Sequence, residues 1–389
     1  MSLASVAAAE ARREAAATLG YYNVKLGPSV WRFGSALSLE WNDNVRLEAD
    51  APKSDLILRP ELSARMLWPV SQFNQVNLSL AAGYSAYCEH SEFDRAYIRP
   101  GSEVSFDLYA GDLWINVYDR FSILEDNYLD PTVTGVGGYS RLENAAGAVL
   151  TWDLNEAFAR LEYTHLNYVE LEDNEGAQPD GVSELLALSL GFLPQAGVLA
   201  GVELGGGLVR YEEDPQRGFD RGTQWNAGLF ADYQLTEYLK ARGSAGYTVF
   251  SPEDDNTAAL DTGDFSGIYA QLALTHRLNH HVRYTLSAGR QVSFTFYGGT
   301  VDLYYGRLGV DWNVLRKISL STGFEAEHGE YITFGEEEFT RMGPSIRVGR
   351  QLMKQLSASL EYRFYSRHSD QSGRDYSVNI GRVALVYTF

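Results

Sequence analysis

YSVNIGRVALVYTF, residues 376–389, is the stretch that decides the fold of this chain, because it alternates and ends the sequence. Successive side chains of a β-strand point to opposite faces, so every second residue shares a face. One face is apolar and aromatic and carries Gly381, Val383, Leu385, Tyr387 and Phe389. The other face carries Arg382, Ala384, Val386 and Thr388. The pattern predicts a strand with one apolar face that ends in an aromatic residue.

A terminal aromatic residue in phase with an apolar face resembles the closing strand of a bacterial outer-membrane β-barrel. The resemblance implies that the barrel-assembly machinery is a partner. It also implies an assembly signal made of Val383, Leu385, Tyr387 and Phe389. The alternative is an ordinary half-buried strand that happens to end the chain, and the rest of the sequence decides between the two.

The composition fits a β-rich membrane protein. The 389 residues include 25 tyrosines and 37 glycines, which is typical of β-structure with tight turns and interfacial aromatic residues. No run of about 18 uninterrupted apolar residues occurs, so helical membrane spans are excluded but a barrel is not. The formal charge of −19 argues against a nucleic-acid partner. The single cysteine, Cys88, excludes an intrachain disulfide and a cysteine-based metal cluster.

Strand-like runs follow one another from residue 30 onward, with almost no helical interruption. In one run Leu356, Ala358, Leu360, Tyr362 and Phe364 alternate with Ser357, Ser359, Glu361 and Arg363. Such runs suit a wall with one face on lipid or a dry core and the other in water. Aromatic residues near strand ends on the apolar face are consistent with a belt at the membrane interface: Trp41, Trp68, Trp152, Tyr233 and Trp312.

Short and long connections alternate along the chain. Short turns are expected near residues 69–72, 111–112, 155–156, 194–197, 236–237, 279–280, 315–317 and 354–355. Longer, mostly acidic connections are expected at 42–53, 124–140, 170–181, 212–221, 251–264, 330–338 and 369–373. In outer-membrane barrels short turns face the periplasm and long loops face outside. The scheme predicts an all-β fold, a transmembrane antiparallel up-and-down β-barrel of about 18 strands with both termini periplasmic.

Residues 3–19 are rich in alanine and predict a short N-terminal helix. The segment lacks a basic start and a continuous apolar core, so it does not resemble a signal peptide. An exported protein needs such a signal, and we therefore expect the sequence to begin after a cleavage site or to be incomplete. Three roles stay open for the helix: a periplasmic tail, a plug in the barrel, or a docking element for an envelope protein partner.

The polar face of the expected strands is mixed in charge and mildly basic. The candidate residues along a solute path are Arg277, Arg283, Arg307, Arg341, Arg347, Glu361, Arg363, Arg367 and Arg382. In one interpretation basic residues attract an anionic solute or polymer into the channel. In the other, lumen charges pair across neighbouring strands and keep the interior wet. The excess acid lies in the long connections, either as solvated surface or as carboxylates that bridge lipopolysaccharide phosphates through divalent cations.

Arg290 departs from this assignment of faces, because it falls in phase with the apolar residues Val282, Tyr284, Leu286 and Ala288. Two explanations stay open. Either a β-bulge resets the phase of the strand, or Arg290 lies beyond the hydrocarbon band.

No catalytic constellation is visible. The sequence has no GxSxG, no HExxH, no Walker-type phosphate loop and no GxGxxG after a strand. His276, His280 and His281 cluster, but they straddle an expected turn, and a solvated turn is preferred over a metal site. We predict no enzyme activity, no catalytic residue, no cofactor and no metal.

The segment ALSLEWNDNVRLEADAPKSDLILRPELSARM, residues 36–66, resembles the putative β-barrel porin 2 family of bacterial outer-membrane proteins. Members of that family tend to open with a strand that ends in an aromatic-Asn/Asp-Asp-Asn-Val/Ile segment, matched by residues 41–45. A second strand then alternates around a proline, matched by Pro60, and the C-terminal strand fits as well. The resemblance covers residues 20–389. It implies a channel-like barrel without catalytic residues, and some relatives are similar to export porins that accompany exopolysaccharide machinery.

We therefore predict a periplasmic helix or tail in residues 1–28, with a possible plug or partner role, and an outer-membrane β-barrel in residues 29–389. The expected function is a porin-like channel for passive passage of hydrophilic solutes. One alternative is an export porin for an anionic exopolysaccharide, with part of the path lined by Arg307, Arg341, Arg347, Arg363 and Arg367. The other is a structural barrel that anchors an envelope complex. Outer-membrane lipid and lipopolysaccharide are expected partners, and nucleic acid is not.

Overall fold

The computed structural model describes residues 22–124, 126–136, 140–171, 180–211, 221–253, 265–294, 300–332 and 337–389. In these residues the first half of the chain forms β1 (Val24–Leu26), β2 (Ser29–Asn42), β3 (Asp55–Pro69), β4 (Gln75–Tyr87), β5 (Arg95–Ala110), β6 (Leu113–Leu124), β7 (Arg141–Asp153), β8 (Ala157–Glu170), β9 (Gly181–Gln195) and β10 (Val198–Tyr211). The second half forms β11 (Arg221–Gln234), β12 (Leu239–Glu253), β13 (Phe265–Arg277), β14 (Val282–Phe294), β15 (Thr300–Leu315), β16 (Ile318–Tyr331), β17 (Glu338–Gln351), β18 (Leu356–Ser369) and β19 (Tyr376–Thr388).

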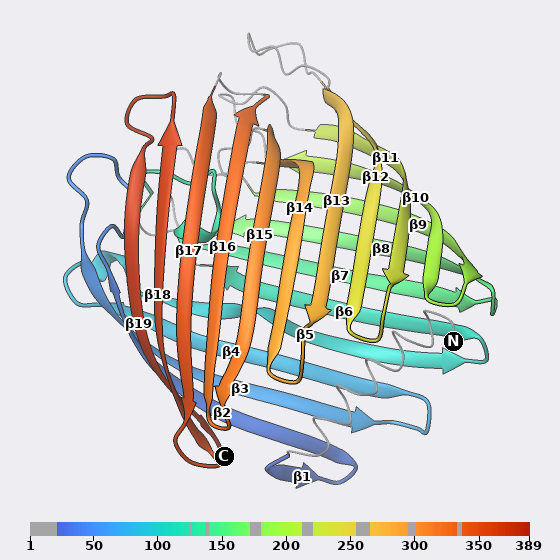
Figure 1. Cartoon of the computed structure of the whole chain (residues 1–389), viewed down its shortest axis with the longest axis horizontal. Helices are drawn as coiled ribbons and strands as arrows, with labels where there is room; N and C mark the ends of the chain where they lie inside the picture. Colours follow the sequence, from blue (N-terminus) through green and yellow to red (C-terminus); the bar gives the residue numbers. More distant parts are fainter. Residues whose placement is uncertain are drawn as a thin grey trace.

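Strands β2 to β19 close into an antiparallel barrel of 18 strands in the described part of the chain. Each strand pairs with the next along the sequence, so every connection is a hairpin. The ring closes where β19 pairs with β2, with Arg382 directly opposite Glu40 and Leu385 opposite Leu37. Figure 1 shows the two walls of the barrel crossing at an angle. The expected strand number and topology are confirmed.

One described strand lies outside the ring. In the described part of the chain, strand β1 pairs with β2 through Val24–Leu26. The helix expected at residues 3–19 lies outside the described residues. No helix among the described residues is long and apolar enough to cross a membrane.

The apolar face of each strand points outward and stays exposed. Leu37, Leu385 and Leu360 belong to neighbouring strands and are 49%, 43% and 59% exposed. The residues between them point inward, where Glu40 and Arg59 are buried. This arrangement is the reverse of a soluble barrel and is the one that lipid favours.

The aromatic residues expected at the interface lie on the outer face. Their exposed fractions are 47% for Trp41, 43% for Trp68, 51% for Trp152, 43% for Tyr233 and 44% for Trp312. Trp41 is the last residue but one of β2, and Trp68 is the last residue but one of β3. Because the two strands are antiparallel, the two rings lie near opposite ends of the barrel. Amphipathic rings at both edges of an apolar band are typical of a membrane-spanning wall.

Arg290 keeps the phase of its strand. It pairs with Ala270 on β13 and Tyr304 on β15 without a register shift, so no bulge turns it inward. Its guanidinium lies outside the barrel and forms an ion pair with Asp302, with 2.7 Å between Arg290 Nη2 and Asp302 Oδ2. Since Arg290 lies four residues before β14 ends, its position supports the second explanation, a site beyond the hydrocarbon band.

The connections divide the barrel into two ends. The end that we call the short-turn end has the connections 70–74, 111–112, 154–156, 196–197, 235–238, 278–281, 316–317 and 352–355. The opposite, long-loop end includes the connections after β2, β4 and β6. The main apolar cluster is inside the barrel, toward the long-loop end, and contains Leu47, Tyr128, Val133, Tyr365, Tyr376, Val378 and Ile380.

Candidate functional site: the lumen and its inward loop

The connection between β6 and β7 folds into the barrel, and we call its described residues 126–136 the inward loop. Tyr128 stacks on Tyr365 of β18, with 5.8 Å between ring centroids. Asn127 Nδ2 donates hydrogen bonds to the carbonyl oxygens of Val45 and Val136, at 2.9 and 2.7 Å. The loop therefore packs against the connection after β2 and the closing strands, although these are far away in sequence.

A buried ion pair on β16 and β17 holds Tyr128 of the inward loop. Arg341 and Glu327 are each 2% exposed, and 2.6 Å separates Arg341 Nη2 from Glu327 Oε2. Arg341 Nη1 also donates a hydrogen bond of 2.6 Å to the carbonyl oxygen of Tyr128. A buried charge is tolerated only when it is paired and its hydrogen bonds are satisfied. Arg341 meets both conditions through the wall and the loop together.

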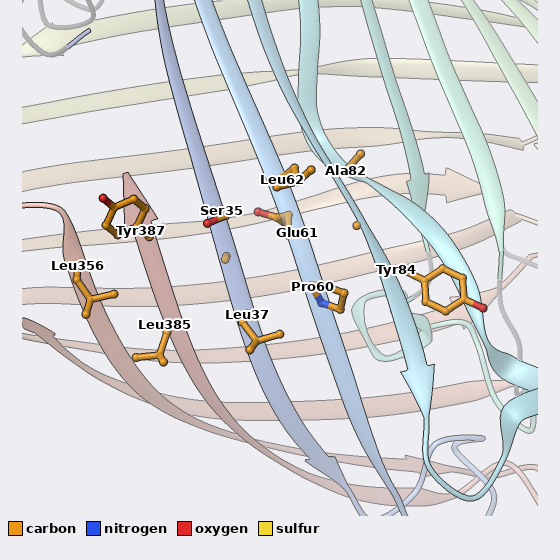
Figure 2. Close-up of a pocket in the computed structure, with 12 residues that line it drawn as sticks. Ser35, Leu37, Pro60, Glu61, Leu62, Ala82, Tyr84, Leu356, Leu385 and Tyr387 are labelled. Atoms are coloured by element: carbon orange, nitrogen blue, oxygen red, sulfur yellow. The ribbon is translucent and has the colours of Figure 1, made fainter. Parts of the chain in front are cut away.

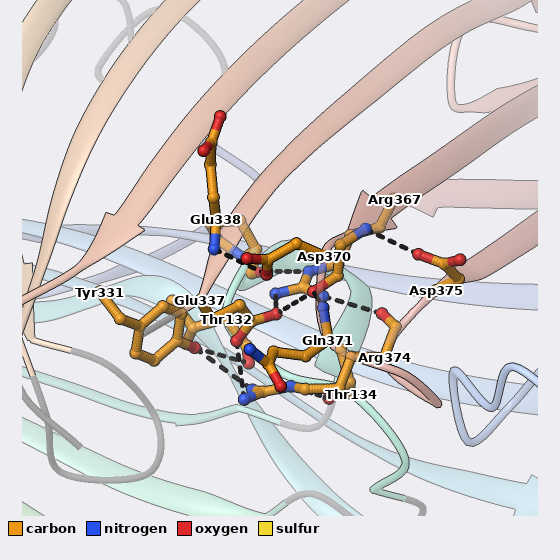
Figure 3. A network of polar contacts seen from close by, with 12 residues as sticks. Thr132, Thr134, Tyr331, Glu337, Glu338, Arg367, Asp370, Gln371, Arg374 and Asp375 are labelled. Atoms are coloured by element: carbon orange, nitrogen blue, oxygen red, sulfur yellow. Dashed lines mark hydrogen bonds and ion pairs between the residues drawn. The ribbon is translucent and has the colours of Figure 1, made fainter. Parts of the chain in front are cut away.

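A second network holds the end of the loop, and Figure 3 shows it. Arg367 Nη2 and Arg374 Nη1 each lie 2.7 Å from one carboxylate oxygen of Glu337. Arg367 Nε donates to the carbonyl oxygen of Pro131 at 3.1 Å. Arg374 Nε donates to Thr134 Oγ1 at 3.3 Å. One carboxylate thus orients two guanidinium groups, and both groups bind the loop.

A third network holds the start of the loop at the seam where the barrel closes. Glu40 is fully buried between Arg382 and Arg59, with 2.6 Å from Arg382 Nε to Glu40 Oε2. Arg59 Nη1 lies 3.0 Å from Asp126 Oδ1. Burial raises the pKa of Asp126, but the positive charges of Arg59 and Arg382 outweigh burial and leave that pKa below its usual value. Asp126 is therefore held as a carboxylate.

These three networks pin the inward loop to one side of the lumen, over strands β16–β19 and β2–β3. A loop fixed in this position narrows the passage at that height. The opposite wall keeps charged side chains in contact with water: Arg120, Arg160 and Arg242 face inward with 53%, 45% and 65% of their side chains exposed. The interior is therefore wet beside the loop.

The structure separates the nine candidate path residues into groups. Arg341, Arg367 and Arg382 hold the inward loop, as described. Arg363 and Glu361 form an ion pair with each other on β18. Arg307 bridges Glu325 and Glu327, at 3.8 and 3.1 Å, with half of its side chain exposed. Arg277, Arg283 and Arg347 face the lumen nearer the short-turn end. Contact of any of them with a solute stays a prediction.

Sequence reasoning missed the partners on the connections. Asp126, Tyr128, Glu337 and Arg374 lie outside the strands or at their ends, where alternation gives no information about direction. The one available signal was the length of the connection between β6 and β7, because long loops in compact proteins are often functional. That signal could single out the loop but not its docking site.

A hollow of about 520 Å³ on the outer wall is not part of the lumen. It crosses the closing seam, where Ser35, Pro60 and Ala82 are small and Leu62 and Tyr387 stand beside them (Figure 2). Its large side chains belong to the exposed apolar face, so the hollow faces the membrane. Its shape suits hydrocarbon chains and gives no passage for polar solutes.

Solved structures of several bacterial proteins share this architecture. Pseudomonas aeruginosa OccK2 (OpdF) has a TM-score of 0.54 at 11% identity, over 92% of this chain and 98% of that chain. Acinetobacter baumannii OccAB3 has a TM-score of 0.51 at 10% identity, over 94% and 100%. A BenF-like porin from Pseudomonas fluorescens Pf-5 has a TM-score of 0.52 at 10% identity, over 92% and 99%. The sequence matches none of the curated proteins compared with it. At such low identities the structural likeness shows the fold.

The fold, the outward apolar face and the wet interior define a β-barrel of the porin class of the outer membrane. Residues 30–389 match the family model described as putative beta-barrel porin 2. The chain belongs to that family, as the resemblance of residues 36–66 implied.

Proposed function

We propose that the protein is a channel for passive passage of hydrophilic solutes through the outer membrane. The observation that carries the proposal is the solvent exposure of lumen-facing charges on the wall opposite the inward loop, such as Arg160 and Arg242. Exposed charges inside a closed barrel require water beside them, and a barrel of this width generally leaves an aqueous lumen. The family assignment supports the same conclusion.

We further propose that both ends of the chain lie on the periplasmic side. The end of β19 adjoins a short turn, because Thr388 N donates a hydrogen bond of 2.8 Å to the carbonyl oxygen of Gln355. β2 begins beside this same short-turn end. In outer-membrane barrels the short turns are periplasmic, which supports the orientation.

Single-channel recording tests the function. The purified protein, with and without residues 1–21, is inserted into a planar phosphatidylcholine bilayer in potassium chloride. We expect steady ohmic steps from both forms, because the proposed passage is the lumen itself. Conductance only after removal of residues 1–21 would make that segment a plug. Silence of both forms, with the barrel shown to be folded by heat-modifiable gel mobility, would overturn the channel and favour the structural barrel.

A further inference from the structure

A cavity of about 1010 Å³ opens at the short-turn end of the lumen, beside β15–β19 and the start of β2. Small lumen-facing residues hollow the wall there, namely Ser319, Ser321, Gly349, Ser357 and Ser359. Six cationic side chains also line the cavity, namely Arg32, Arg316, Lys317, Arg347, Arg350 and Lys354. None of its described lining residues is an aspartate or a glutamate. We call this cavity the basic vestibule.

No ion pair joins a cation of the basic vestibule to a carboxylate among the described residues, and Glu361, which stands opposite Arg347 in the register of β17 and β18, pairs with Arg363. Arg347 is exposed, and its side chain donates one hydrogen bond, to Ser359 Oγ at 3.2 Å. Arg32 stands directly opposite a second arginine, Arg65, in the register of β2 and β3. Like charges opposite each other destabilise a strand pair. An anion beside Arg32 would relieve this repulsion, whereas the buried arginines that hold the inward loop already have their carboxylates.

The basic vestibule also contrasts with the charge of the whole chain. The protein carries a formal charge of −19, and acidic residues crowd the long connections of the sequence, for example residues 170–173 and 212–214. A cleft of one sign within low-dielectric walls focuses the electrostatic potential and raises the local concentration of opposite ions. The local concentration of anions is therefore raised at the short-turn mouth.

From these observations we propose that the basic vestibule binds soluble multivalent anions, that is, molecules with two or more carboxylate or phosphate groups. The proposal rests on the proposed channel function, because the ligand enters through the lumen. Arg32 and Arg347 are the principal ligands, since both lie in the lumen-facing phase and guanidinium groups bind carboxylate and phosphate in a bidentate manner. Arg350 belongs to the outward phase of β17, so a lipid headgroup phosphate would depend on Arg350 instead.

Sided block of the channel tests the site. Citrate is added to one compartment of a phosphatidylcholine bilayer during potassium chloride recording. Orientation is read from the single cysteine, Cys88, which is exposed and follows β4 at the long-loop end, with an impermeant bulky maleimide. We expect citrate to reduce the conductance at lower concentration from the short-turn side. We expect the R32Q/R347Q double variant to weaken the block about tenfold, from the loss of two charge-assisted contacts.

The matched control is R160Q/R242Q, which removes the same charge from β8 and β12 on another part of the wall. It should retain the block within about twofold. Citrate block that is weakened equally in both double variants, or that is equal from both sides of the bilayer, would overturn anion binding at the basic vestibule. Only a general attraction between the barrel and anions would then remain. Loss of the block in R350Q but not in R32Q/R347Q would overturn the assignment of Arg32 and Arg347 as the principal ligands.

Calorimetric titration of citrate into the detergent-solubilised barrel at low salt separates this proposal from the channel itself. Binding that is weakened in R32Q/R347Q supports the basic vestibule even if the bilayer stays silent, in which case only the channel function fails. A conducting channel that neither binds citrate nor is blocked by it overturns the basic vestibule and leaves the channel function intact.

Discussion

At the scale of the residue, the lumen-facing arginines have two distinct environments. Arg341 and Arg367 are each 2% exposed and donate to carbonyl oxygens of the inward loop as well as to carboxylates. Arg347 is exposed and has one neutral partner, Ser359. The first kind has no capacity left for a solute, whereas the second does. The export alternative named both kinds, and only Arg307, Arg347 and Arg363 of its five residues lie outside the loop anchors.

Removal of the Arg341 side chain should destabilise the barrel markedly. In Arg341→Ala the carboxylate of Glu327 stays buried with Arg307 as its remaining partner, and the carbonyl of Tyr128 loses a donor. Breaking a buried pair in this way costs about 3 kcal/mol or more. Urea unfolding in detergent measures the loss. Arg316→Ala, in an exposed turn, should change stability by less than about 0.5 kcal/mol. Equal effects in the two variants would contradict the anchoring role.

Protonation of Asp126 at low pH should weaken the contacts that hold the start of the inward loop. Its folded-state pKa lies below the ordinary value of 3.8, so its contribution to stability is complete above that value and is lost as the pH falls through the lower folded-state pKa. Hydrogen exchange of the loop amides should therefore accelerate below about pH 3.8. In Asp126→Asn exchange should already be faster at neutral pH and depend less on acid. An identical pH profile in both proteins would contradict this assignment.

At the scale of the element, the inward loop is placed by three sets of strands. β16 and β17 hold Tyr128, β18 and the connection after it hold residues 131–134, and β2, β3 and β19 hold the start of the loop. Because these anchors lie on a rigid wall, the loop acts as a fixed constriction. The apolar pair of Tyr128 and Tyr365 adds a stacked contact that no exposed loop would have.

Replacement of the loop should widen the channel. When residues 127–135 are exchanged for a glycine-serine linker of equal length, we expect the single-channel conductance to rise roughly twofold, because the linker cannot dock and the lumen of such a barrel is otherwise wide. The same exchange of residues 49–54, which are exposed, is the control and should leave conductance unchanged. An unchanged conductance in the loop variant would place the narrowest point elsewhere.

At the scale of the molecule, alternation and connection length were enough to predict the barrel. Side chains such as Leu385 and Leu360 repeat every second residue, and the eighteen barrel strands follow directly from such runs. The inward loop could not be predicted in the same way. Arg341 reaches Tyr128 across 213 residues and Arg367 reaches Pro131 across 236, and local patterns contain no information about contacts of that range. Local sequence patterns therefore predict the strands of the barrel wall. The position of the inward loop depends instead on contacts between residues that are far apart in the sequence.

The position of Glu40 makes the narrowing of the channel a late event in biogenesis. Glu40 lies on β2 and its partner Arg382 lies on β19, so the guanidinium group that donates to the Tyr128 hydroxyl is set in place only when the first and last barrel strands have met. Until that moment the loop has been synthesised, but its contact with β19 is missing. Residues 126–128 of a nascent barrel should therefore be more sensitive to protease than those of the closed barrel, which makes the start of the loop a reporter of completed insertion.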